Sequence, residues 1–168
     1  DGSEMNRAVV NLPDRRLERL IEMYRPRKTV PATLEIVDIP GLEVGPQGNG
    51  RGPRLLGHIK GVEALLHVLR CFEYDGAPLE DEMIDPVRDI ETVDLEMMVA
   101  DSVTVENKMN RMAKRMRGGD KDAIREVADC EKVYAAIQQG IPVRKQNLNA
   151  HEMASIRECN LVSLKPVL

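Results

Sequence analysis

An apolar run at residues 34–39 ends in Pro40-Gly41 and leads into a glycine-rich loop at residues 45–52. The run has the length and side chains of a strand. In α/β folds that bind phosphates, ligands lie beyond the carboxyl ends of strands, where Asp38 and Gly41 would fall. Such an Asp can hold Mg²⁺ directly or through water, and such a Gly lets a backbone N–H approach a phosphate. Taken alone the pattern is weak, because many Asp/Gly pairs only form turns.

Further apolar segments indicate an α/β fold. Residues 33–39 and 64–70 are near-continuous apolar runs, and the pattern of 64–70 is typical of a parallel sheet covered on both faces. Residues 8–10 predict a short edge strand, and residues 161–168 are strand-like. A helix is expected over residues 14–25. Its apolar face carries Leu17, Leu20, Ile21 and Tyr24.

The glycine-rich loop at residues 45–52 does not match a phosphate-binding P-loop, because Arg51-Gly52 stands where a P-loop has Lys-Ser/Thr. Its four glycines favour a mobile loop that becomes ordered around a ligand. An ordinary surface loop is the alternative. A helix is expected over residues 54–62, and we interpret its His58 as solvated or packed rather than catalytic.

The pattern changes to long helices at Asp85, a good N-cap that is followed by Pro86. A helix is expected to run to about residue 117, and Gly118-Gly119 then separates it from a second helix capped by Asp120. Each helix carries an apolar stripe at alternating spacings of four and three, and such stripes predict an antiparallel coiled-coil hairpin. The stripes are Val105, Met109, Met112 and Met116, and Ala123, Val127, Cys130, Tyr134, Ile137 and Ile141. A Met stripe that binds a partner helix is the less favoured alternative, and a short helix is expected from about Asn149 to Cys159.

Charges are segregated along the helical region. Residues 73–106 contain twelve acidic side chains and a single basic one, Arg88. Residues 108–125 contain seven basic side chains and two acidic ones. Such a basic cluster is a candidate contact for a polyanion, of which RNA is the most plausible. The candidate contact residues are Lys108, Arg111, Lys114, Arg115, Arg117 and Lys121.

The three cysteines, Cys71, Cys130 and Cys159, are far apart and lack the spacing of metal ligands. They indicate reduced thiols in a cytoplasmic protein, with Cys71 and Cys130 as small core residues. No apolar run approaches the ~18 residues that span a bilayer, so a soluble chain with no membrane partner is expected. The oligomeric state is left open.

Several segments, in chain order, resemble the Obg-like ATPases, the YchF family of P-loop NTPases. Val37-Asp38-Ile39-Pro40-Gly41-Leu42 is similar to the switch II of that family, and His67-Val68-Leu69-Arg70-Cys71-Phe72-Glu73 is similar to its next strand. The other matching segments are residues 11–17, 85–91, 118–121 and 164–166. The resemblance covers nearly the whole chain, from switch I through the inserted helical domain.

The resemblance implies a partial G-domain sheet formed by residues 1–84 and 160–168, with an inserted helical domain at residues 85–159. It implies that Asp38 and Gly41 face the terminal phosphate of ATP or GTP, with Mg²⁺ held through Asp38. The complete protein would bind and hydrolyse nucleotide and act with the ribosome in translation. The preference between ATP and GTP is left open.

The chain also departs from the family pattern. No Walker A loop occurs in its 168 residues, so whether it is part of an active enzyme is left open and no tightly bound cofactor is expected. The glycine-rich loop is shorter than in the family and lacks its Lys. Two alternatives therefore remain. One is a non-hydrolysing relative that binds RNA or the ribosome through the basic hairpin, and the other is a plain helical interaction protein.

The strand that precedes the P-loop lies, in the fold that this chain resembles, between strands 33–39 and 64–70. Strands sit about 4.8 Å from their neighbours, so these two should be about 10 Å apart, with an empty slot between them. Unpaired backbone groups at such a slot are costly. We therefore expect the chain to be a fragment of a larger protein, or another segment to fill the slot.

Overall fold

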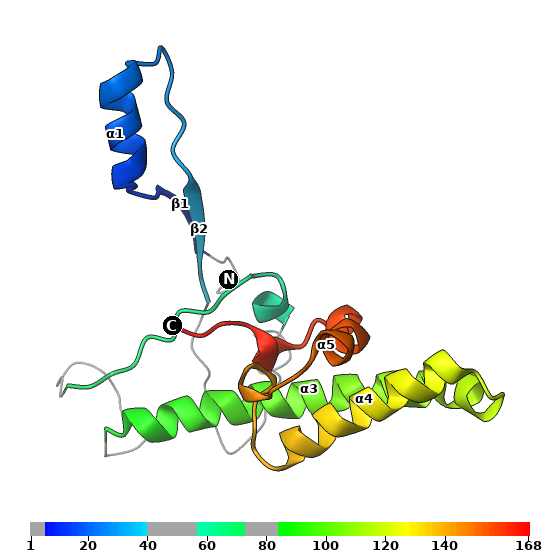
Figure 1. Ribbon diagram of the computed structural model, residues 1–168. Coiled ribbons are helices and arrows are strands. Elements are labelled where there is room, and N and C mark those ends of the chain that lie inside the picture. The colour runs from blue at the N-terminus through cyan, green and yellow to red at the C-terminus, as the bar shows by residue number, and fades with distance from the viewer. Residues whose placement is uncertain (1–5, 40–56, 73–83) are drawn as a thin grey trace. The chain divides into compact units, whose positions relative to one another are not determined.

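The computed structural model describes residues 6–39, 57–72 and 84–168 (Figure 1). The chain divides into two compact units, residues 1–41 and 42–168, and each is described by itself. The predicted slot between residues 33–39 and 64–70 involves both units and stays a prediction. None of the helices in the described ranges is long and apolar enough to cross a membrane.

The first unit contains two antiparallel strands and one helix. Strand β1 (Asn6–Asn11) pairs with β2 (Thr33–Asp38), with Asn6 opposite Asp38 at one end of the ladder and Asn11 opposite Thr33 at the other. Helix α1 (Arg15–Tyr24) lies between them in sequence, and it begins where the Asp14 carboxylate accepts a hydrogen bond from the Arg16 N–H at 2.9 Å. The predicted strands and helix are confirmed.

The burial expected of these strands is not found. No described residue of the first unit is buried, and Val9 and Ile36 are 68% and 45% exposed. Each strand pairs with a single neighbour, and no described layer of the unit buries either face of the ladder. The apolar side chains at residues 33–39 are typical of a strand buried in a sheet, and the described residues of this unit do not bury them.

The second unit is built on two helices that lie side by side (Figure 1), α3 (Pro86–Arg117) and α4 (Lys121–Gln138). Asp85 caps α3 by accepting the Arg88 N–H at 3.0 Å. The turn between the helices contains Gly119 at φ +81°, a backbone conformation that favours glycine. The structure supports an α/β fold with these two packed helices, and whether they supercoil as a coiled coil stays a prediction.

One apolar core joins α3 and α4 to helix α5 (Ala150–Ile156) and to two short 3₁₀ helices, η1 (Val143–Lys145) and η2 (Arg157–Cys159). Its buried side chains are Met98, Val105, Cys130, Val133, Ile137, Val143, Ile156, Cys159 and Leu161. Burial raises the pKa of Cys130 to about 11, which keeps its thiol protonated at neutral pH. The predicted core role of Cys130 is confirmed, whereas Cys71 is exposed, contrary to expectation.

The strand expected at residues 161–168 is only partly present. Residues Val162–Leu164 form a 3₁₀ helix, η3, and only Val167 makes a β-bridge, which is parallel and joins it to Leu65. Leu66 and Val68 are 72% and 83% exposed, so the prediction that segment 64–70 is covered on both faces is wrong for this chain. Within the described chain, the backbone of segment 64–70 pairs only with residues 166–168. Every second side chain of the segment is therefore exposed to solvent. In the expected helix at residues 54–62, residues 57–60 are helical and those before 57 lie outside the described ranges.

Candidate functional site

Asp38 is the last residue of β2, at the end of the ladder, and its side chain is exposed. Its carboxylate has no hydrogen-bond partner within the described part of the chain. A free carboxylate of this kind suits Mg²⁺, which keeps several waters and takes only one or two carboxylates from a protein. Gly41 and loop 45–52 lie outside the described residues.

Residues 6–39, 57–72 and 84–168 contain no group of three or more His, Cys, Asp or Glu side chains arranged to hold a metal ion.

Five of the six predicted polyanion contacts are exposed, near the end where α3 and α4 are joined: Arg111, Lys114, Arg115, Arg117 and Lys121. Arg115 forms two hydrogen bonds to the Asp120 carboxylate, through Nε at 3.0 Å and Nη2 at 2.8 Å. Asp120 also caps α4, and its hydrogen bonds to the Ala123 N–H and to Arg115 lower its pKa. The Arg115 charge is thus partly neutralised, while its neighbours keep their charges in solvent.

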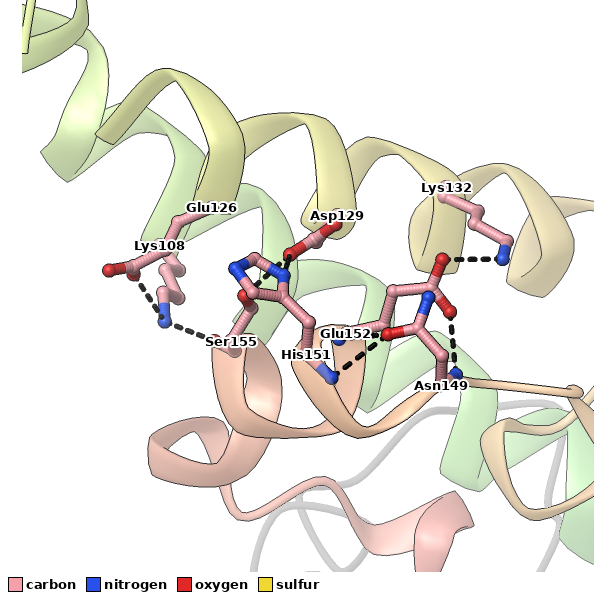
Figure 2. A network of polar contacts seen from close by, with 8 residues as sticks. All are labelled: Lys108, Glu126, Asp129, Lys132, Asn149, His151, Glu152 and Ser155. Atoms are coloured by element: carbon pink, nitrogen blue, oxygen red, sulfur yellow. Dashed lines mark hydrogen bonds and ion pairs between the residues drawn. The ribbon is translucent and has the colours of Figure 1, made fainter. Parts of the chain in front are cut away.

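Lys108, the sixth predicted contact, is buried, which corrects the sequence-based assignment. Its Nζ donates to the Ser155 carbonyl oxygen of α5 and lies 3.3 Å from Glu126 Oε2 of α4 (Figure 2). Position 108 continues the core-facing side of α3 that contains Val105 and Met112. A cation on this side is enclosed by the neighbouring helices and needs partners there, so it is not free to bind RNA.

A network of polar contacts attaches α5 to α4 (Figure 2). Asp129 Oδ2 accepts the Ser155 hydroxyl at 2.6 Å and lies 2.7 Å from His151 Nδ1. Lys132 Nζ donates to Glu152 at 2.7 Å, and Glu152 also closes a capping box with Asn149. The serine and the histidine bind the same carboxylate and not each other, so this is a docking contact and not a nucleophile–base pair.

The Lys132–Glu152 contact predicts a pH-dependent stability. The hydrogen bond from Lys132, and then that from the Asn149 N–H, lower the pKa of Glu152 below its ordinary 4.5. The contact therefore stabilises the fold fully above pH 4.5, and this contribution is lost as the pH falls through the lowered pKa. In thermal unfolding from pH 7 to pH 3, we expect the wild type to lose more stability than Glu152→Gln. The exposed Glu131→Gln should behave as the wild type, and equal pH profiles for all three proteins would contradict the assignment.

Two buried acidic residues of α3 escaped the sequence analysis. Asp101 accepts the backbone N–H groups of Val162 at 2.8 Å and Ser163 at 2.7 Å. Asp94 pairs with Arg144, with its two oxygens 2.5 and 2.6 Å from Nη2. The signal that could have found them is their spacing of seven residues, in register with the core residue Val105. An acid on a core-facing stripe needs a buried partner.

Comparison with known proteins finds relatives that share more than a third of their aligned residues with this chain. It is 40% identical over 166 residues to "Ribosome-binding ATPase YchF" of Escherichia coli O157:H7, covering 98% of this chain and 46% of the relative. It is 36% identical to the protein of that name from Bacillus subtilis, covering 97% of this chain and 45% of the relative. It is 38% identical to "Obg-like ATPase 1" of Oryza sativa subsp. indica, covering 97% of this chain and 42% of the relative.

A solved structure agrees with these relatives. The YchF GTPase of Schizosaccharomyces pombe superposes with a TM-score of 0.81 at 30% identity, covering 96% of this chain and 45% of that one. The chain thus spans about half the length of the relatives it matches. No protein-family model matches the chain.

Proposed function

This chain is homologous to the YchF and Obg-like ATPase family over almost its whole length, and we propose that the complete protein binds and hydrolyses ATP or GTP and works with the ribosome in the cytoplasm. The observation that carries this proposal is the 36–40% identity to ribosome-binding ATPases over 97–98% of the chain. The fold supports the proposal, because the solved structure of a YchF GTPase has the same fold.

Asp38 and Gly41 supply the phosphate side of this proposal. Mg²⁺ bound with the nucleotide would neutralise charge that develops on the transferred phosphate. Asp38 would hold this ion or one of its waters, for which its exposed carboxylate at the end of β2 is available. Gly41 would offer its N–H to the terminal phosphate, because a residue without Cβ permits close approach.

The helical region supplies the ribosome side. Residues 85–159 form an inserted domain in this proposal, and residues 1–84 and 160–168 belong to the nucleotide-binding domain. Helices α3 and α4 are the coiled-coil arm of the inserted domain, and ribosomal RNA is its target. The exposed cations Arg111, Lys114, Arg115, Arg117 and Lys121 support this, since basic clusters contribute most of the sequence-independent affinity for RNA.

A second candidate is a relative that binds the ribosome without hydrolysing nucleotide. The shortened glycine-rich loop without its Lys favours this candidate. Such a protein would bind the ribosome but would not hydrolyse nucleotide.

The test combines two measurements on the complete protein. We expect Mg²⁺-dependent hydrolysis of ATP or GTP, and co-sedimentation with ribosomes that weakens as salt is raised. Co-sedimentation without hydrolysis would select the second candidate. Absence of both hydrolysis and co-sedimentation would reject the proposal.

A further inference from the structure

The surface of α3 carries a shallow hollow of about 600 Å³ at residues that neither the core nor the phosphate site uses. It is lined by Thr104, Asn107, Asn110 and Arg111. These positions are three, three and one residues apart, so they share one side of the helix. Lys114 follows on the same side, four residues after Asn110. From Thr104 to Lys114 this side is about 15 Å long, at ~1.5 Å per residue. We name these five residues the α3 polar face.

The α3 polar face offers hydrogen bonds and positive charge, and none of its members is an acid. Asn107 and Asn110 are exposed, and in the described part of the chain neither amide has a hydrogen-bond partner. Each amide offers two donors and one acceptor oxygen. Arg111 and Lys114 are exposed as well, and both contribute donors only. The neutral amides thus lie nearer to Thr104, and the cations lie nearer to the turn that joins α3 to α4.

We propose that the α3 polar face binds a single RNA strand, with phosphates on Arg111 and Lys114 and with 2′-hydroxyls on Asn107 and Asn110. The inference rests on the proposed ribosome-binding role and specifies the chemistry of that contact. Cations bind the phosphate backbone without sequence preference, while amides can hydrogen-bond to 2′-hydroxyls, which RNA has and DNA lacks. A face with both groups side by side binds RNA in preference to DNA of the same sequence.

An acidic protein surface is the competing ligand, and the amides argue against it. A carboxylate accepts hydrogen bonds and donates none, so the amide oxygens of Asn107 and Asn110 would remain unpaired against it. A 2′-hydroxyl is a donor as well as an acceptor and therefore suits the amides.

The experiment measures binding of a fluorescein-labelled 20-nucleotide single-stranded RNA of mixed sequence to the full chain, as a function of salt, with DNA of the same sequence as second probe. For the double variant Asn107→Ala/Asn110→Ala we expect RNA binding about tenfold weaker with an unchanged salt slope, and DNA binding nearly unchanged. For Arg111→Gln/Lys114→Gln we expect weaker binding of both probes and a salt slope smaller by about 1.4, at ~0.7 per phosphate contact for single strands. Gln138→Ala removes an exposed amide from α4 and should match the wild type.

The result that overturns the inference is RNA binding by the Asn double variant that equals the wild type, or an equal loss for RNA and DNA. Poly-glutamate that binds as tightly as the RNA, with the same dependence on Asn107 and Asn110, would overturn it in favour of an acidic protein. Loss of RNA affinity together with a lower unfolding temperature would also count against it, since exposed side chains should not affect folding. Nucleotide hydrolysis is measured on the wild-type complete protein, so failure of the proposed enzymatic function and failure of this contact are distinguishable.

Discussion

Replacing Asp38 with alanine in the complete protein is expected to lower Mg²⁺-dependent nucleotide turnover by about 10- to 100-fold, the usual cost of losing a group that orients a metal. Turnover should fall because the exposed Asp38 carboxylate at the end of β2 is the group that we propose holds Mg²⁺ or one of its waters. Steady-state hydrolysis measured over a range of Mg²⁺ concentrations checks this. The defect should be partly relieved at high Mg²⁺ if Asp38 contributes affinity for the ion.

Glu35→Ala is the matched control for Asp38→Ala. It also removes a carboxylate from β2, but Glu35 forms an exposed ion pair with Arg7 at 3.1 Å, across the ladder. An exposed pair of this kind contributes about 0–1 kcal/mol, so turnover should be unchanged. Equal turnover of wild type and Asp38→Ala at every Mg²⁺ concentration would show that the metal-side assignment is wrong.

Asp101→Ala is expected to lower the free energy of unfolding by about 2–6 kcal/mol. The change leaves the buried N–H groups of Val162 and Ser163 without an acceptor, and each unsatisfied buried donor costs about 1–3 kcal/mol. Urea denaturation should show a lower midpoint at an unchanged m-value. Glu106→Ala, an exposed acid on the same helix, should stay within about 0.5 kcal/mol of the wild type. A similar small effect of Asp101→Ala would contradict the role of this carboxylate as a fastening point between α3 and η3.

Asp101 also gives stability a pH dependence opposite to that of Glu152. Burial is the largest influence and raises the pKa of Asp101 above its ordinary 3.8, although hydrogen bonds from Ser163 and Val162 act against it. Its contribution is therefore fully present below pH 3.8 and is lost as the pH rises through the raised pKa. As the pH rises through the raised pKa, the free energy of unfolding of the wild type should fall relative to that of Asp101→Asn. A difference independent of pH would show that the carboxylate does not titrate there.

The positions of the helices followed from the sequence because the signals that set them are local. Asp14, Asp85 and Asn149 each cap the helix that they were expected to begin, by binding N–H groups two or three residues away. The stripe through Val105 and Met112 was visible because one helix repeats its faces every 3.6 residues. The resemblance to the Obg-like ATPases was likewise carried by short segments, and the relatives confirm it.

Burial and long-range pairing were decided only by the tertiary structure. Lys108 was expected on the surface and is buried, because the charge of a residue does not reveal which segment will cover it. Asp101 binds backbone groups 61 and 62 residues away, which no local pattern encodes. The apolar segment at residues 64–70 was expected to be covered on both faces, but Leu66 and Val68 are exposed. Hydrophobic side chains show that a strand gains by burial, but not which other segment will bury it. The sequence by itself determined the helices and their apolar faces, which depend on neighbours within a turn or two. Which faces meet, and which polar groups they enclose, depends on contacts between distant segments, and only the fold decided it.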